Sequence, residues 1–226
     1  MKGETLKKVL MGLAVAAALL FLLYAVREYG AAMYAESQTR RGVSAFEEGD
    51  VAGAERIFQA AVRINPKYAG AWLNLGAAAR ERGKHEKALD AFHRVLEITD
   101  DAAAVKAARL GLAAIYGNSA IKPPLRERDW YARAVRQYER LIEVEPGNPE
   151  YHMRLGFAAI DSVDPGRGFP ELRRASELAA GPEHKWIHEK LLSFYQVINL
   201  RDEAGRELKI IEGFSEGAED VPEEER

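Results

Sequence analysis

The stretch Ala69–Ala102, with the sequence AGAWLNLGAAARERGKHEKALDAFHRVLEITDDA, decides the fold. Its apolar and small residues recur at helical spacing in two runs separated by Gly83. Counted from Ala69, positions 4, 7, 8, 20 and 24 are Trp72, Leu75, Gly76, Ala88 and Phe92. Small residues at positions 8 and 20 allow two helices to approach closely, and the large residues fill the remaining space. The stretch therefore predicts a pair of packed helices.

The same pattern occurs 34 residues earlier in the chain. Motif residues stand there in the same phase, namely Gly42, Ala45, Gly49, Ala54, Phe58, Ala61 and Pro66. A single helix pair cannot bury its own apolar face, so repeated pairs stack and form a continuous core. Two copies in one phase therefore predict a stack of helix pairs.

Three weaker copies follow. In the third, the motif residues are Leu110, Gly111, Ala114, Ala134, Tyr138, Leu141 and Pro146. Eleven extra residues lengthen its inner turn, around Gly117–Pro124. In the fourth they are Leu155, Gly156, Ala159, Leu172 and Ala175, and Pro170 is expected in the first turn of the second helix. In the fifth they are Leu191, Tyr195, Ala204, Leu208 and Ile211.

With this pattern the chain resembles the tetratricopeptide repeat (TPR) family over about residues 35–212. The resemblance implies an all-α fold, a solenoid of about five helix pairs. The expected repeats are 35–68, 69–102, 104–148, 149–182 and 185–212. It also implies a concave groove that binds peptides or partner helices, and no catalysis, so we do not expect an enzyme.

The first thirty residues predict a membrane anchor. Val9–Val26 is an 18-residue run without charge, roughly 27 Å long as a helix and close to the hydrocarbon thickness of a bilayer. Lys2, Lys7 and Lys8 precede it, so the positive-inside rule keeps residues 1–8 in the cytoplasm. We expect an uncleaved single span over 9–26, a juxtamembrane segment over 27–34, and repeats on the periplasmic side of a bacterial inner membrane. A cleaved signal peptide is the alternative.

Charge and cysteine content exclude several classes of protein. The chain carries a net charge of −3 and no cysteine, which excludes a disulfide framework, a thiolate zinc site and a thiol nucleophile. Residues 213–226 alone carry −5, and no basic stripe suits nucleic acid. We expect this acidic tail to be disordered. The alternative is that it docks on basic residues of the same or another copy.

Candidate ligand-binding residues lie at position 6 of the five copies. They are four cations and one amide: Arg40, Asn74, Arg109, Arg154 and Lys190. The family resemblance places position 6 on the concave wall, where such residues bind acidic peptides or C-terminal carboxylates. Arginine offers a carboxylate a bidentate fork, and an asparagine amide can hold a ligand backbone. The alternative is that Asn74 serves the fold and the arginines pair with nearby acids.

A second set of candidate groove residues is apolar. Leu73, Tyr116 and Phe157 are expected to line the groove for an amphipathic or extended partner segment. Five further residues share these helix faces, namely Ala77, Leu112, Ile115, Met153 and Ile160. Packing in the core is the alternative for each of them.

Neither a metal nor a cofactor is expected. His184 and His188 have helical i, i+4 spacing, but neither an HExxH motif nor a third nearby histidine accompanies them. No glycine-rich loop with a P-loop lysine is present.

The sequence thus predicts a membrane-tethered scaffold or adaptor that binds a protein or peptide partner during assembly of bacterial envelope complexes. Two alternatives remain open. One is an accessory subunit of a large membrane complex, and the other is a cytosol-facing receptor on an organelle membrane.

Overall fold

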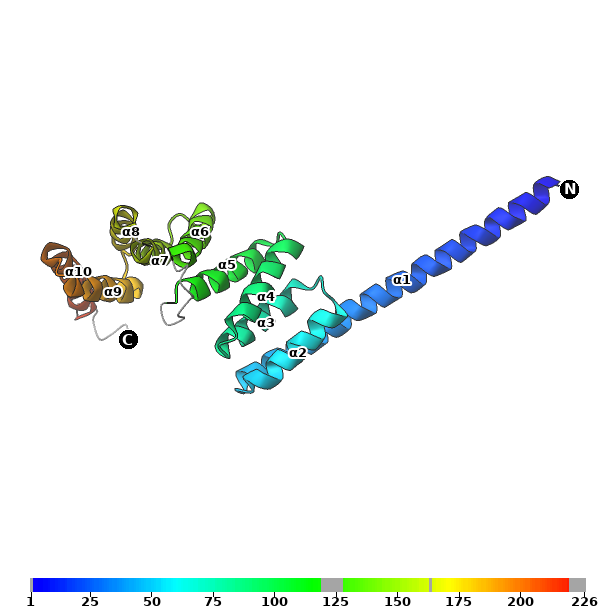
Figure 1. Ribbon diagram of the computed structural model, residues 1–226, viewed down its shortest axis with the longest axis horizontal. Coiled ribbons are helices and arrows are strands. Elements are labelled where there is room, and N and C mark those ends of the chain that lie inside the picture. Colours follow the sequence, from blue (N-terminus) through cyan, green and yellow to red (C-terminus); the bar gives the residue numbers. More distant parts are fainter. Residues whose placement is uncertain (1, 119–127, 163, 220–226) are drawn as a thin grey trace. The chain divides into compact units, whose positions relative to one another are not determined.

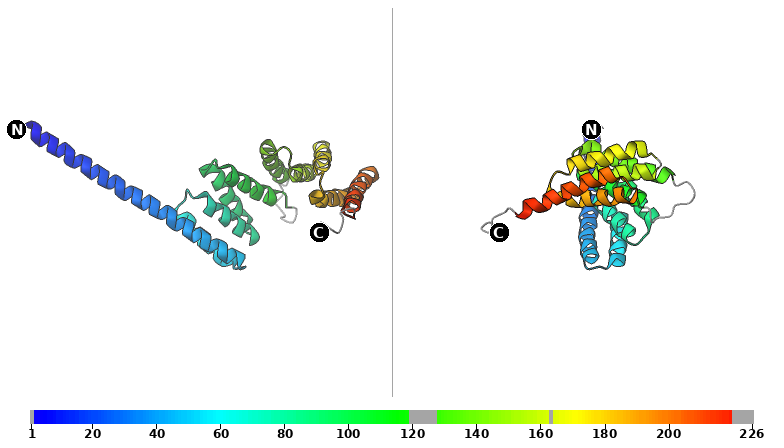
Figure 2. Two further views of the ribbon diagram at one scale, coloured as in Figure 1. Left: turned by 180° about the vertical axis from the view of Figure 1, so that it is seen from behind. Right: turned by 90° about the vertical axis from the view of Figure 1, so that its left-hand side faces the viewer.

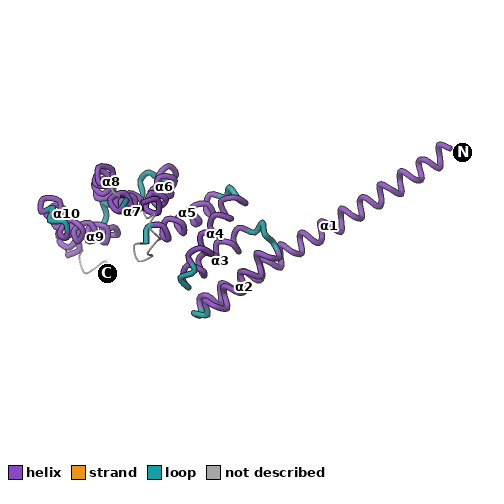
Figure 3. The backbone as a smooth tube through the Cα atoms, viewed as in Figure 1, coloured by secondary structure: helices purple, strands orange, loops and turns teal. Residues whose placement is uncertain are grey.

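The computed structural model describes residues 2–118, 128–162 and 164–219, and in this part of the chain the regular elements are helices (Figure 3). The prediction of an all-α fold is confirmed. A short 3-10 helix, Pro182–His184, precedes α9. The α-helices are α1 Lys2–Glu47, α2 Val51–Ile64, α3 Ala69–Glu81, α4 His85–Ile98, α5 Ala102–Tyr116, α6 Arg128–Val144, α7 Pro149–Asp161, α8 Pro165–Leu178, α9 Lys185–Val197 and α10 Arg201–Glu219.

The chain forms two compact units, residues 1–108 and 109–226. In the first unit α1 pairs with α2 and α3 pairs with α4, and α2 lies along the C-terminal part of α1 in every view (Figure 1, Figure 2). In the second unit α7 pairs with α8 and α9 pairs with α10, while α6 packs against α7. These are the stacked helix pairs of an α-solenoid.

Glycine at position 8 sets the distance between the two helices of a pair. A Cβ atom on Gly42 would stand 2.5 Å from the ring of Phe58, and one on Gly76 would stand 2.7 Å from the ring of Phe92. On Gly156 it would stand 2.5 Å from Leu172. The close crossings expected from the sequence are therefore present in both units.

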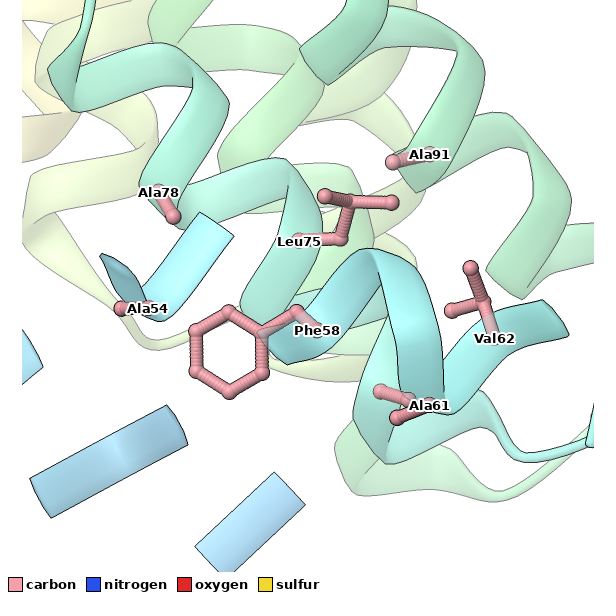
Figure 4. Close-up of a cluster of buried hydrophobic side chains, with 8 residues drawn as sticks. Ala54, Phe58, Ala61, Val62, Leu75, Ala78 and Ala91 are labelled. Carbon is pink, nitrogen blue, oxygen red and sulfur yellow. The ribbon is translucent and has the colours of Figure 1, made fainter. Parts of the chain in front are cut away.

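The core of the first unit forms where α2 meets α3. Phe58 and Leu75 are at most 3% exposed, and alanines fill the space around them (Figure 4). The small residues Ala54, Ala61, Ala78 and Ala91 bring the helix backbones close enough for these two side chains to bridge them.

A buried carboxylate joins the first two repeats. Glu55 of α2 is 2% exposed and accepts hydrogen bonds from Arg82, Lys84 and Lys87. Burial alone would raise the pKa of Glu55, but the hydrogen bonds from Lys87, Lys84 and Arg82 lower it from 4.5 to about 2. The cluster therefore fixes α2 to the turn that begins α4.

Residues 27–34, expected as a juxtamembrane segment, are part of the continuous helix α1. Two sequence expectations need correction. α8 begins at Pro165 with Asp164 as its N-cap, so Pro170 lies inside the helix and not in its first turn. α10 continues to Glu219, so the first residues of the expected disordered tail are helical. The rest of that tail, 220–226, and most of the lengthened turn, 119–127, lie outside the described residues.

We predict that Gly156→Ala loosens the fourth repeat. The added methyl group would stand 2.9 Å from the backbone carbonyl oxygen of Gly168 as well as against Leu172, and such overpacking costs about 1–3 kcal/mol. Hydrogen exchange of the α7 and α8 amides in the full chain measures the loss of protection, and hence of stability, in this repeat. As the control, Gly205→Ala adds a methyl group with no atom within 4 Å and should leave protection unchanged or raise it by up to ~1 kcal/mol. Equal effects of the two changes would contradict the prediction.

We also predict that Glu55→Gln destabilises the first unit by about 1–3 kcal/mol at neutral pH, because three cations lose a charged acceptor. The lowered pKa means that the stabilisation by Glu55 is complete above pH 4.5 and is lost as the pH falls toward 2. Thermal unfolding followed by circular dichroism measures the melting temperature at pH 5 and at pH 2.5. The melting temperature should fall more between these two pH values in wild type than in the variant. Parallel losses would show that the cluster does not contribute.

Candidate functional site

In the first unit, the position-6 residues make contacts within their own helices. The Arg40 guanidinium lies 2.9 Å from the Glu36 carboxylate one turn earlier, and both side chains are more than half exposed. The Asn74 amide donates to the carbonyl oxygen of Gly70 at 2.8 Å. Leu73, on the same helix as Asn74, is half-buried. These residues belong to α1 and α3, which contact each other.

In the second unit, two cations stand at equivalent positions of α7 and α9, which are in contact. Arg154 donates to Glu150 at 2.6 Å, and its side chain is 46% exposed. Partial burial works against the charge of Arg154, but Tyr138 and Glu150 raise its pKa. Lys190 is exposed and forms no ion pair with any described residue. Arg154 is thus paired with a neighbouring acid, as Arg40 is with Glu36, whereas Lys190 presents its positive charge to solvent.

The structure places Arg109 at position 4 of its repeat rather than at position 6. The buried residues of α3 are Ala71, Leu75, Gly76, Ala78 and Ala79. The same spacing recurs in α5 at Ala108, Leu112, Ala113, Ile115 and Tyr116. Equivalent residues of α3 and α5 are therefore 37 positions apart in the sequence, whereas the register expected from the sequence placed them 35 apart. Arg109 therefore corresponds to Trp72 and not to Asn74.

Hydrogen bonds support this register. Position 4 bonds to position 23 of the same repeat in three successive copies of the second unit. The pairs are Arg109 with Gln137 at 3.3 Å, His152 with Glu171 at 2.7 Å, and His188 with Glu207 at 2.6 Å. We call these three pairs the position-4 bridges. Each of them ties the first helix of a repeat to the second.

The position-4 side chain also contacts the end of the preceding repeat. Trp72 donates to the carbonyl oxygen of Pro66 at 2.9 Å, and ring nitrogens of His152 and His188 lie 3.0 and 2.8 Å from the carbonyl oxygens of Pro146 and Ala179. Burial opposes the charge of His188, but hydrogen bonds to Glu207 and Ala179 raise its pKa. The two histidines are therefore structural in this fold.

The apolar candidates have different environments. Tyr116 is 3% exposed and packs edge-on against Trp130, with ring centroids 5.0 Å apart. Phe157 is half-buried and packs edge-on against Phe194 of α9 at 5.1 Å. Tyr116 thus belongs to the core, while Phe157 lies in the contact between two repeats. Leu112, Ile115 and Met153 are also in the core.

Sequence reasoning missed a cleft between α6 and α8. The cleft has a volume of about 630 Å³ and carries four arginines and three glutamates, with Glu171 of a position-4 bridge in its lining. Arg140 pairs with Glu143, and Arg167 pairs with Glu139. The charged lining residues are Arg109, Arg136, Arg140, Arg167, Glu139, Glu143 and Glu171. Except for Arg109 of α5, these residues lie on the second helices α6 and α8, and the recurrence of charged residues on these two helices is the signal that the sequence contained.

A second cleft, of about 690 Å³, lies between α8 and α10. Its lining includes Glu207, which is 4% exposed and also accepts from Ser176 at 3.2 Å. Burial and the nearby Glu207 and Glu203 raise the pKa of Tyr195, on the wall of the same cleft, to about 12. The two clefts thus have a similar construction, each beside a position-4 bridge.

The described residues contain no group of three or more histidines, aspartates and glutamates arranged to hold a metal ion. His184 and His188 are turned to different partners, since His184 lies 3.4 Å from Glu183 whereas His188 bonds to Glu207.

Comparison with known proteins places these features in a family. The profile of the tetratricopeptide repeat family matches residues 45–115. An uncharacterized protein of Methanocaldococcus jannaschii is 38% identical over 64 residues, which are 28% of this chain and 74% of that protein. Superkiller complex protein 3 of Mus musculus is 29% identical over 133 residues, which are 55% of this chain and 8% of the mouse protein.

Solved structures share the fold at low sequence identity. The solved chain of MamA from Desulfovibrio magneticus RS-1, which runs from its residue 41 to the end, superimposes with a TM-score of 0.64 at 17% identity, over 83% of this chain and 97% of the solved chain. YrrB, described as a TPR protein with an unusual peptide-binding site, superimposes with a TM-score of 0.55 at 12% identity, over 78% of this chain and 84% of YrrB. The repeat pattern, the glycine crossings and these matches agree, and the chain belongs to the tetratricopeptide repeat family.

Proposed function

We propose that this protein is a membrane-tethered scaffold that binds a protein or peptide partner during assembly of envelope complexes. The observation that supports the proposal is that one continuous helix, α1, contains both the apolar run and the first helix of the first repeat. Its N-terminal part is apolar and entirely unburied, with a mean hydropathy of 2.1, and its C-terminal part is the first helix of the first repeat. A helix of this kind joins an anchor to a binding module without any intervening domain.

The charge distribution supports the proposed orientation. Lys2, Lys7 and Lys8 precede the apolar run, and positive residues of short segments remain on the cytoplasmic side. The two units would then lie in the periplasm, with the single span, residues 9–26, in the inner membrane.

Partner binding is supported by the fold and by the exposed cations. Repeat stacks present extended surfaces to peptides, and YrrB is a TPR protein described as having a peptide-binding site. Arg154 and Lys190 lie on adjacent first helices, and Arg40 and Asn74 stand at the equivalent position in the first unit. Cations at this spacing suit an acidic segment or a C-terminal carboxylate. Leu73 in the first unit, and the exposed part of Phe157 in the second, would each add apolar contact within its own unit.

We predict that a cysteine at position 48 is labelled from the periplasm. The chain has no native cysteine, so Glu48→Cys, in the exposed turn after α1, gives a single reactive thiol. A membrane-impermeant maleimide should label it in intact spheroplasts. The control Lys7→Cys, at the other end of the apolar run, should react only after permeabilisation. The reverse pattern would place the repeats in the cytosol.

We further predict that the double change Arg154→Glu and Lys190→Glu weakens binding of an acidic decapeptide with a free C-terminus by at least about tenfold. Charged hydrogen bonds contribute about 1.5–3 kcal/mol each, and 1.4 kcal/mol corresponds to about tenfold in affinity. Fluorescence anisotropy with the full chain in nanodiscs measures the effect, and an amidated Asn/Gln version of the peptide serves as the uncharged probe.

The control makes the same change in net charge on second helices, by Arg94→Glu and Arg174→Glu, whose side chains are 44% and 54% exposed. It should retain binding. Equal weakening by both double variants would indicate a general charge effect, and no binding to wild type would exclude an acidic ligand of this kind.

A further inference from the structure

The part of α1 that follows the apolar run exposes large apolar side chains. Tyr29, Met33 and Tyr34 are 76%, 67% and 55% exposed, although they lie beyond the charged pair Arg27 and Glu28. Aromatic residues at this distance from a span are typical of the membrane–water interface, where an apolar ring and a polar edge are both accommodated.

The helix geometry gives the height of these residues above the bilayer. α1 becomes buried at Ala35, which is 0% exposed and nine residues after Val26. At 1.5 Å per residue this corresponds to roughly 14 Å. The headgroup layer on each side of a bilayer is about 5–8 Å thick. The Tyr29 backbone, about 4–5 Å beyond Val26, therefore lies inside this layer. The backbones of Met33 and Tyr34, about 10–12 Å beyond Val26, lie a few ångströms above the layer, and their long side chains can reach down to it.

The turn between α2 and α3 lies at the same end of the first unit. α2 returns along α1, because Phe58 packs at Gly42. Both helices rise by the same amount per residue, so the turn at 65–68, about seven to ten residues after Phe58, lies level with residues about seven to ten before Gly42. The exposed Lys67 of this turn lies just before Tyr68. Its long side chain suits a lysine that extends toward headgroups.

We propose that the interfacial layer of the bilayer covers Tyr29, Met33 and Tyr34, and that Lys67 contacts its phosphate groups, so that the first unit rests on the membrane surface. This inference rests on the proposed membrane tether. The continuity of the exposed face with the apolar run in one helix identifies the bilayer as the occupant.

Single cysteines carrying a nitroxide label test the proposal in the full chain, reconstituted in vesicles of phosphatidylcholine and phosphatidylglycerol. The rate at which the label collides with oxygen, which partitions into lipid, is compared with its rate of collision with a water-soluble nickel chelate. The ratio of the two rates reports how deeply the label lies in the bilayer. The four sites are Leu19→Cys, Met33→Cys, Lys67→Cys and Glu48→Cys. We expect lipid exposure to fall in this order, with position 48 fully aqueous and position 67 at headgroup depth.

A helical insertion supplies the matched control. Seven residues inserted after Ala31 keep the helix phase and lift everything beyond by about 10 Å. Positions 33 and 67 should then become as aqueous as position 48, while position 19 is unchanged.

The outcomes separate the two proposals. An aqueous position 19 would overturn the tether and this inference together. A lipid-exposed position 19 with positions 33 and 67 as aqueous as position 48 would overturn only the inference. A label at position 33 shielded from both reagents would show a protein partner on this face and would also overturn it.

Discussion

The close approach of two helices at position 8 is the constraint on which the rest of the structure depends. Where Gly42, Gly76 or Gly156 stands, the facing side chain occupies the space that a Cβ atom would need. In the fourth repeat the contact extends to the backbone, because Gly156 also faces the carbonyl oxygen of Gly168. Once the two helices are this close, the large residue at position 24 is buried, and the next pair finds a flat apolar surface on which to stack.

Polar contacts then fix the order and spacing of the repeats. The aromatic Trp72 at position 4 of the second repeat is replaced by Arg109, His152 and His188 in the repeats that follow. These side chains can bond to the second helix as well as to the preceding turn, which an indole with a single N–H cannot do. In the first unit Glu55 and its three cations take over this role between neighbouring repeats. The position-4 contact with the preceding turn thus occurs in both units, and the first unit adds the charged cluster around Glu55 to it.

The sequence predicted the helix pairs because small residues at fixed spacing have few other uses in a helix. It did not predict the register of the third repeat, because Gly111 resembles a position-8 glycine. In the structure position 8 is Ala113, and Tyr116 stands at position 11. The α6–α8 cleft was also missed, because its charged residues come from three helices, α5, α6 and α8, and only the fold brings them together. Similarly, the helical start of the tail depends on packing, since Phe214 lies 5.6 Å from the ring of His188.

The unbroken course of α1 also has a rotational consequence. The helix contains no proline and has no interruption between Lys2 and Glu47, so no joint allows its two halves to swivel independently. Each residue of an α-helix advances by about 100° around the axis. The rotation of the first unit about the axis of α1 is therefore fixed relative to the apolar half of the helix. A neighbour that binds one face of the apolar half also determines on which side of α1 the helices α2 and α3 lie.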